Sequence, residues 1–206
     1  MAENDISLMA HLMRRAGFGA PREELEERVK KGYEATVEEL LHPDEQEPVN
    51  KYVLRRYHPW TWKPGTMTGH GAAEWMHYML ATKRPLEEKM TLFWHQLFAT
   101  GVSKIDHYHE LREMIDLFRE KGMGGYREIL LGMARSPAMI YWLDNCENHG
   151  DAVNENWGRE LLELFSMGVG NYTEVDVREA SRAFTGWTLT PVPPRGPLAR
   201  HKWDFE

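Results

Sequence analysis

The sequence predicts an all-α fold, an irregular domain of about nine to eleven helices. Three observations support this prediction. Apolar residues recur at helical spacing through most of the 206 residues. Proline, serine or asparagine stands where helices would begin, and glycine stands where they would end. No segment has the alternating pattern of a strand, and we expect Thr188 to Pro197 to form a proline-rich loop.

The composition is that of an ordinary globular protein, with 42% hydrophobic and 28% charged residues. A formal net charge of −7 argues against nonspecific nucleic-acid binding, which needs a basic surface. Cys146 is the single cysteine, so neither an intrachain disulfide nor a cysteine-based zinc site can form. No apolar run reaches the ~20 residues of a membrane span, and the first residues lack the pattern of a signal peptide. We therefore expect a cytoplasmic protein.

Three short helices are expected near the N-terminus, over residues 5–15, 22–31 and 34–42. In the first of them, Leu8 and Leu12 should face inward, with Met9 as a further candidate. The turn Gly-Phe-Gly-Ala-Pro separates the first two helices, because proline favours the first turn of a helix. The basic pair Arg14 and Arg15 precedes this turn. A helix-end or salt-bridge role is the simpler interpretation of the pair, and anion binding beside the glycine turn is the alternative.

The next part of the chain is the least regular. Proline and glycine are dense in residues 43–70 and break helices there. Trp60 and Trp62 would either pin this stretch to the helical body or form a surface on which a ligand stacks. A helix over residues 71–82 follows, with Glu74-x-x-His77 at the spacing found in di-iron bundles. The chain has no second copy of that motif, so we predict no metal site from it.

The helix from Pro85 to about Ala99 is expected to be central, because apolar residues cover most of its circumference. Glu88, Thr91 and His95 lie together on one side of it. His95 is either a core histidine with a satisfied hydrogen bond, or a base or ligand that works with carboxylates further along the chain. The inward side chains should be Leu86, Met90, Phe93, Trp94, Leu97 and Phe98.

Three more helices should precede the last part of the chain. One covers residues 105–121 and another covers 126–134. Ser136 and Pro137 would begin the third as its cap and first residue. In the first of the three, the inward side chains should be Tyr108, Leu111, Ile115 and Phe118.

The stretch NENWGRELLELFSMGVGNYTEVDVREASRAFTGW, residues 154–187, predicts two helices joined by a glycine-rich turn. Asn154 is a suitable N-cap for the first helix, and Gly168 with Gly170 would end it. Thr173 and Asp176 have the spacing of a capping box at the start of the second. Two apolar faces should meet in this corner: Trp157, Leu161, Leu164 and Phe165 from the first helix, and Val177, Ala180, Ser181 and Phe184 from the second.

A polar stripe lies beside the apolar face of the first corner helix: Asn156, Glu160, Glu163 and Met167. Carboxylates so close to a buried face need partners, because burying an unpaired charge costs several kcal/mol. The nearest cations in the sequence are Arg159, Arg178 and Arg182. Two interpretations follow. The stripe is either an Arg–Glu network that locks the two helices together, or a carboxylate site for a metal ion or a proton.

The same residues 154–187 resemble the signature of a bacterial family known as domain of unknown function 1800. Three further stretches agree with that family: HLMRRAGFGAP at residues 11–21, EKMTLFWHQLFATG at 88–101 and MARSPAMIYWLDN at 133–145. The resemblance covers nearly the whole chain. It implies a helical bacterial protein and brings no established activity or cofactor with it.

The resemblance has further implications. The family domain continues past the Thr-Gly-Trp segment, so residues 1–206 are expected to be a single helical domain, the N-terminal portion of a longer one. Relatives often carry Trp-His-x-His where this chain has Leu97 in place of the second histidine, which weakens a metal-site interpretation. Relatives are often exported, and a sulfatase-like protein encoded nearby is implied as a candidate partner.

Two functional hypotheses follow. The first is a noncatalytic helical scaffold or binding protein with a buried network of Glu, Asn, Arg and His side chains, with Asn154, Asn156, Arg159, Arg178 and Arg182 as its binding residues. The alternative is an enzyme, hydrolase-like or metal-assisted, that uses His95 with Glu160 and Glu163. The chain lacks the motifs of P-loop, Rossmann, zincin and α/β-hydrolase enzymes. The sequence indicates no cofactor and no substrate.

Overall fold

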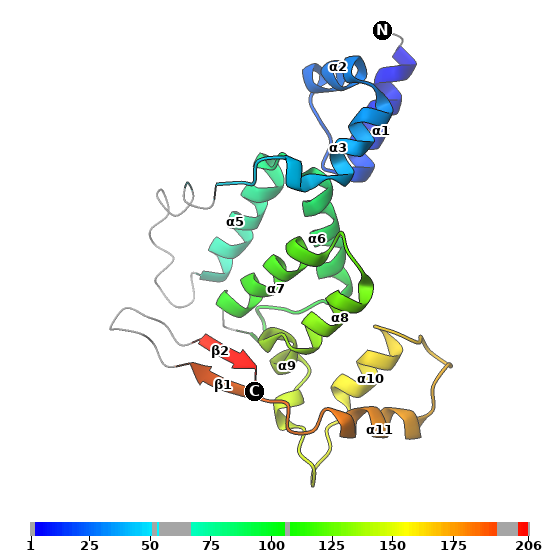
Figure 1. Cartoon of the computed structure of the whole chain (residues 1–206). Helices are drawn as coiled ribbons and strands as arrows, with labels where there is room; N and C mark the ends of the chain where they lie inside the picture. Colours follow the sequence, from blue (N-terminus) through cyan, green and yellow to red (C-terminus); the bar gives the residue numbers. More distant parts are fainter. Residues whose placement is uncertain (1–2, 51–52, 54–66, 106–107, 193–201, 206) are drawn as a thin grey trace. The chain divides into compact units, whose positions relative to one another are not determined.

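A computed structural model of the chain describes residues 3–50, 53, 67–105, 108–192 and 202–205. It confirms the all-α fold: helices make up nearly all of the regular structure in these residues (Figure 1). The α-helices are α1 (Glu3–Ala16), α2 (Arg22–Lys31), α3 (Tyr33–Leu41), α5 (Met67–Ala81), α6 (Pro85–Leu97), α7 (Tyr108–Lys121), α8 (Tyr126–Ala134), α9 (Pro137–Trp142), α10 (Asn156–Glu163) and α11 (Glu174–Ala183). Two short 3-10 turns, η1 (Pro43–Glu45) and η2 (Asn145–Glu147), also lie within the described residues.

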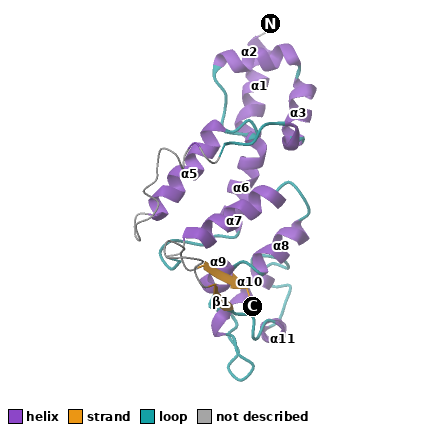
Figure 2. Ribbon diagram, turned by 60° about the vertical axis from the view of Figure 1, so that its left-hand side comes forward, coloured by secondary structure: helices purple, strands orange, loops and turns teal. Residues whose placement is uncertain are grey.

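The prediction that no strand would occur is wrong near the C-terminal end. Strands β1 (Leu189–Val192) and β2 (Lys202–Phe205) pair antiparallel, with Leu189 opposite Phe205 and Val192 opposite Lys202. Figure 2 shows this pair in orange beside the purple helices. Strands of four residues are too short to show an alternating pattern, and a proline lies within β1. Trp60 and Trp62 lie outside the described residues.

The chain forms two compact units, residues 1–94 and 95–206, and the boundary falls within α6. In the first unit, α1, α2 and α3 share a small apolar core made of Met9, Met13, Leu25 and Leu40. The expected inward position of Leu8 is wrong, because Leu8 is exposed and the buried residues of α1 are the two methionines. The end of α1 packs closely on the start of α6, since a Cβ at Gly17 would lie 2.8 Å from the Cβ of Pro85.

The buried face of α6 is polar at its N-terminal end, contrary to the predicted apolar arc. Glu88 is 2% exposed and Thr91 is fully buried, whereas Phe93 is 52% exposed. Hydrogen bonds make this burial possible: Trp75 Nε1 donates to Glu88 Oε2 at 3.2 Å, and Thr91 Oγ1 donates to the carbonyl oxygen of Glu87 at 2.8 Å. Apolar periodicity alone cannot reveal a face whose polar groups are paired inside the protein.

In helix α7, too, the buried face differs from the one that the apolar pattern predicts. Its buried side chains are Glu110, Met114 and Phe118, spaced four residues apart, and the expected inward residues Leu111 and Ile115 are only half-buried. The inward position of Phe118 is confirmed, and its ring stacks on that of Phe98 with 6.0 Å between centroids. The helix that begins at Pro137 is also confirmed, but the side chain of Ser136 makes no cap hydrogen bond there.

Candidate functional site: the α10–α11 corner

Helix α11 begins with the capping chemistry that the sequence indicates, and the cap of α10 lies one residue away from the predicted one. The capping box of α11 is confirmed: Asp176 Oδ2 accepts from the Thr173 N–H at 2.8 Å, and Thr173 Oγ1 accepts from the Asp176 N–H at 3.3 Å. Helix α10 begins later than predicted, with Glu155 at the cap position. Asn154 still satisfies one of its free N–H groups, because Asn154 Oδ1 accepts from the Asn156 N–H at 3.0 Å.

Helix α10 ends sooner than the two glycines suggest. Its last residue is Glu163, and a run of turns leads to Gly168, whose N–H donates to the Leu162 carbonyl oxygen at 3.0 Å. The positive φ of 80° at Gly168 fits the expected role of glycine in closing a helix. In this turn Phe165 is buried, but Leu164 is exposed, so its predicted inward position is wrong.

The two helices cross at a very close contact. A Cβ at Gly158 would lie 2.1 Å from Ser181 Oγ and 2.8 Å from the Ser181 nitrogen, so no larger residue fits without movement of the backbone. The Ser181 hydroxyl is fully buried and donates to the Val177 carbonyl oxygen at 2.8 Å. The ring of Trp157 lies beside those of Phe165 and Phe184, with centroids 5.9 and 5.8 Å away. The corner is therefore packed through small residues at the crossing and aromatic residues around it.

A buried pair of asparagines fastens the preceding loop to α11. Asn148 Nδ2 donates to the Ser181 carbonyl oxygen at 2.9 Å, and Asn148 Oδ1 accepts from the Asn154 N–H at 3.0 Å. Asn145 Nδ2 donates to the Trp187 carbonyl oxygen at 3.1 Å, and Asn145 Oδ1 accepts from Asn148 Nδ2 at 3.2 Å. These bonds satisfy backbone groups at the C-terminal end of α11, where carbonyl oxygens lack helical partners. Neither asparagine is among the site residues that the sequence predicted.

The arginines of the corner pair with different acids from those expected. Arg159 donates to Glu174 at 2.7 Å and to Glu155 at 3.3 Å, which links α10 to the first turn of α11. Arg182 pairs with Glu179 on its own helix at 3.0 Å. Arg159 therefore joins α10 to α11, but its ion pair lies at the surface and its partner is Glu174, not Glu160 or Glu163.

Arg178 and Asn156 are exposed residues of the corner. Among the described residues, neither side chain makes a hydrogen bond or an ion pair with Glu160 or Glu163. The buried polar network is thus made of asparagines and backbone groups.

Glu160 and Glu163 are half-buried and lie one turn apart on α10. Glu163 Oε2 accepts from the Tyr172 hydroxyl at 2.8 Å. Burial raises the pKa of the Glu160 carboxyl above its usual range, and the Glu163 carboxylate adds to this. Within the described part of the chain, the Glu160 carboxylate makes no hydrogen bond. The pair is therefore a local concentration of negative charge on one side of the helix.

Replacing Glu160 with glutamine is expected to raise the free energy of unfolding at pH 7 by up to about 0.5 kcal/mol, the cost of a like-charged pair one helical turn apart. Because the folded-state pKa lies above the unfolded one, protonation of Glu160 favours folding. The advantage of the variant should therefore disappear as the pH falls below the ordinary value of 4.5. Urea denaturation of both proteins at several pH values measures this difference in the free energy of unfolding.

Glu174→Gln serves as the control of opposite sign, since Arg159 holds the Glu174 carboxyl in a hydrogen bond and lowers its pKa. That variant should lose stability at pH 7. A Glu160→Gln protein that is less stable than the unchanged protein at pH 7 would contradict this electrostatic description.

His95 lies near the end of α6 and is partly buried, with its Nδ1 atom inside the protein. Burial lowers the pKa of the imidazole, so the ring is neutral near pH 7. Across the described ranges, no group of three or more His, Cys, Asp or Glu side chains is arranged to hold a metal ion. The cavity of about 500 Å³ described below for residues 1–94 is lined by neither His95 nor the Glu160–Glu163 pair.

The described residues form an all-α fold, and residues 154–187 build the close crossing of α10 and α11 within it. The chain belongs to the family described as "Protein of unknown function (DUF1800)", whose profile matches residues 11–204. The match includes residues of both compact units. No curated protein and no solved structure matches the chain. None of the described helices is long and apolar enough to cross a membrane.

Proposed function

We propose that this chain is a noncatalytic helical binding protein that docks a partner protein on an exposed apolar surface beside the Glu160–Glu163 pair. The observation that supports this most directly is the exposure of large hydrophobic side chains around the end of α10. Leu164 is 57%, Met167 is 49% and Val169 is 77% exposed. Side chains of this size are exposed singly on many proteins, but a group of them marks a site of interaction.

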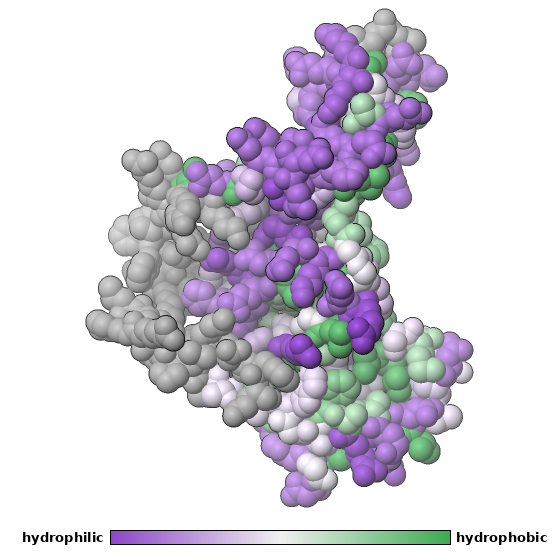
Figure 3. Space-filling view, viewed as in Figure 1, coloured by the Kyte–Doolittle hydropathy of each residue, from purple (hydrophilic) through white to green (hydrophobic). Residues whose placement is uncertain are grey.

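Helix α8 extends this surface. Tyr126 and Leu131 are also exposed, and the Tyr126 hydroxyl donates to the Phe165 carbonyl oxygen, which ties α8 to the turn after α10. Figure 3 shows hydrophobic side chains gathered over α8 and α10 on the face turned to the viewer. We call these five residues the apolar surface: Tyr126, Leu131, Leu164, Met167 and Val169. Tyrosine and methionine are among the residues enriched at protein interfaces.

The elements below the apolar surface are held in one arrangement. The Gly158–Ser181 crossing, the capping box of α11 and the Asn145–Asn148 pair all fix backbone within the corner. A surface that is ordered before binding loses less conformational entropy on association. This rigidity supports a role in recognition and does not require a reaction at the corner.

The charge of the corner indicates the chemistry of the partner. Residues 154–187 contain six carboxylates and three arginines. Two of those arginines already face Glu155, Glu174 and Glu179. Glu160, one helical turn before Leu164, makes no ion pair in the described structure, and Glu163 is bonded to a neutral tyrosine. We infer a partner with an apolar segment flanked by lysine or arginine, because complementary charge sets orientation and association rate.

The location and origin of the protein form part of this proposal. The family resemblance supports a bacterial protein. Cys146 supports a reducing, cytoplasmic environment, because it is the single cysteine. Burial, and then the neighbouring Glu147 carboxylate, raise the pKa of its thiol, so it stays protonated and unreactive. The described residues offer the enzyme hypothesis no comparable support.

Site-specific photo-crosslinking tests this proposal. A photoreactive phenylalanine analogue at Val169 of the full chain, in the cells that produce it, is expected to give one dominant cross-linked species. The same analogue at Leu80, which is 79% exposed on α5, is the matched control and should not give that species. Leu164→Asp, introduced together with the Val169 probe, should reduce the yield about tenfold, as expected when a central apolar contact is lost.

Leu164 is exposed, so thermal unfolding of Leu164→Asp should match that of the unchanged protein. An undiminished yield from this folded variant, or an equal yield of the same species from position 80, would exclude the apolar surface as the docking site.

A further inference from the structure

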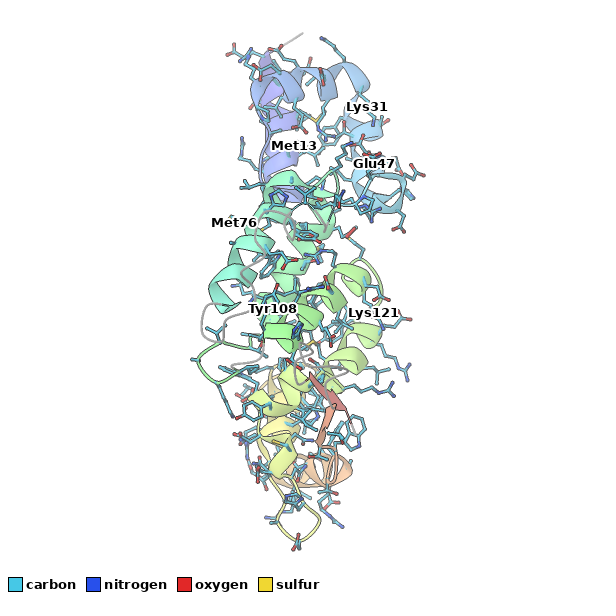
Figure 4. All side chains as sticks on the ribbon, turned by 90° about the vertical axis from the view of Figure 1, so that its left-hand side faces the viewer. Met13, Lys31, Glu47, Met76, Tyr108 and Lys121 are labelled. Carbon is cyan, nitrogen blue, oxygen red and sulfur yellow. The ribbon has the colours of Figure 1, made fainter. Side chains whose placement is uncertain are left out.

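A cavity of about 500 Å³ lies where α1 turns into α2, within the first compact unit. The residues that line it include Ala10, Arg14, Phe18, Gly19, Pro21 and Leu25. Figure 4 labels Met13, the α1 residue whose carbonyl oxygen accepts the Gly19 N–H at 3.1 Å beside this cavity. The volume lies within the range of sites for small organic ligands. Neither the corner nor the proposed docking surface includes any of these residues.

The turn that shapes this cavity has a defined backbone. Gly19 has φ of +91°, which side-chain-bearing residues rarely adopt, and its N–H closes the end of α1. Pro21 follows at the cap position of α2 with φ of −67°. Gly17 is fixed against Pro85 on the other side of the turn. The cavity therefore belongs to a turn of defined conformation.

Two cations flank the aromatic wall of the cavity. Arg14 lines it directly and, within the described ranges, pairs with no carboxylate. Lys89 places its ammonium group 5.2 Å from the centre of the Phe18 ring, and it too forms no ion pair in the described residues. The acidic residues in the first turn of α1, Glu3 and Asp5, lie at the opposite end of that helix. In a chain of net charge −7, this is a local positive site.

The first turn of α2 carries both free N–H groups and two carboxylates. Its cap residue, Pro21, offers no side-chain acceptor to the free N–H groups of the first turn. Glu23 and Glu24 are in that turn, and Glu24 pairs with Arg28 at 2.8 Å. The walls near α2 are otherwise apolar, formed by Ala20 and by the buried Leu25. One end of the cavity thus offers a guanidinium, and the rest offers hydrocarbon and an aromatic ring.

We propose that this cavity binds a small organic anion that has one carboxylate on a flat apolar body. Arg14 receives the carboxylate, because the guanidinium fork matches its two oxygens. The apolar body lies against Phe18, Ala20 and Leu25. Neighbouring Arg15 is exposed and lies outside the lining of the cavity, so the two arginines of one dipeptide have different roles.

NMR titration of the full, ¹⁵N-labelled chain with 4-phenylbutyrate tests this proposal. The amide of Gly19 should shift and saturate. The uncharged 4-phenylbutanol, with the same ring, and butyrate, without it, should each bind about tenfold more weakly, since each lacks one of the two required groups. Arg14→Gln should weaken phenylbutyrate binding about tenfold, and Arg15→Gln should leave it unchanged.

Arg14 and Arg15 are both exposed, so neither change should alter thermal unfolding. Equal binding to the Arg14→Gln and unchanged proteins would overturn the proposal. Absence of a saturable shift at Gly19 in the unchanged protein, or equal affinity for the alcohol, would also overturn it.

Discussion

Replacing Gly158 with alanine is expected to lower the free energy of unfolding by about 2 kcal/mol. The new Cβ would lie 2.1 Å from Ser181 Oγ and 3.0 Å from the Ser181 Cα, so α10 and α11 must separate. Overpacking of this kind costs about 3 kcal/mol, and the better helix propensity of alanine offsets about 1 kcal/mol. Urea denaturation followed by circular dichroism measures the loss.

Two further variants separate the crossing from a general effect of losing a glycine. Gly150→Ala places its Cβ in open space and should change stability by less than about 0.5 kcal/mol. Ser181→Ala, combined with Gly158→Ala, removes the closest clashing atom but leaves the Ser181 nitrogen at 2.8 Å, so it should restore only part of the stability. If Gly158→Ala unfolds at the same urea concentration as the unchanged protein, the helices do not cross at this distance.

Replacing Asn148 with alanine is expected to cost about 3 kcal/mol of stability. The side chain is buried and bonds to the Ser181 carbonyl oxygen, the Asn154 N–H and Asn145 Oδ1. Its removal takes away the acceptor of the Asn154 N–H and the donor to Asn145 Oδ1, whereas the Ser181 carbonyl oxygen keeps the Phe184 N–H as a donor. Each buried group left unsatisfied costs about 1–3 kcal/mol. Denaturation curves for this variant should shift well below those of the exposed control Asn171→Ala, which loses surface bonds to the Met167 and Gly168 carbonyl oxygens.

Asn148→Asp tests which atom of the side chain matters. The carboxylate can still accept from the Asn154 N–H, but it cannot donate to the Ser181 carbonyl oxygen and it buries a charge. As the pH falls and the new carboxyl takes up a proton, it becomes a donor, so part of the lost stability should return. An Asn148→Ala protein as stable as Asn171→Ala would show that the asparagine pair does not fasten the loop to α11.

Features that depend on neighbouring residues could be predicted from the sequence. The capping box of Thr173 and Asp176 spans four residues, and it occurs as expected. The glycine at 168 also adopts its expected conformation, with φ of 80°. Helix ends are determined largely by local chemistry, which a single sequence displays.

Features that depend on distant partners could not be predicted. Asn148 reaches a carbonyl 33 residues away, and Asn145 reaches one 42 residues away. Arg159 was recognised as a candidate for pairing, but its main partner is Glu174, 15 residues further on. A sequence shows which residues can donate or accept a hydrogen bond, whereas the fold decides which of them meet.

The buried faces of α6 and α7 illustrate a second limit. Glu88, Thr91 and Glu110 are buried in place of apolar residues at neighbouring positions. Hydrophobic periodicity assumes that polar groups face water, and it fails where a polar side chain is buried, as Glu88 and Thr91 are through hydrogen bonds inside the protein. The strand pair β1–β2 is a third case, because its pairing joins two segments separated along the chain.

The metal content of the full chain, purified without chelator, tests most directly whether the corner is a recognition surface. It is measured by elemental analysis beside the double variant Glu160→Gln/Glu163→Gln, with circular dichroism to verify the fold. We expect both proteins to be helical and to contain the same small amount of metal, well below one ion per chain, because the role that we propose for the two carboxylates is to face a basic partner. One ion per chain in the unchanged protein, lost in a folded double variant, would contradict this account and make the carboxylate pair a metal site.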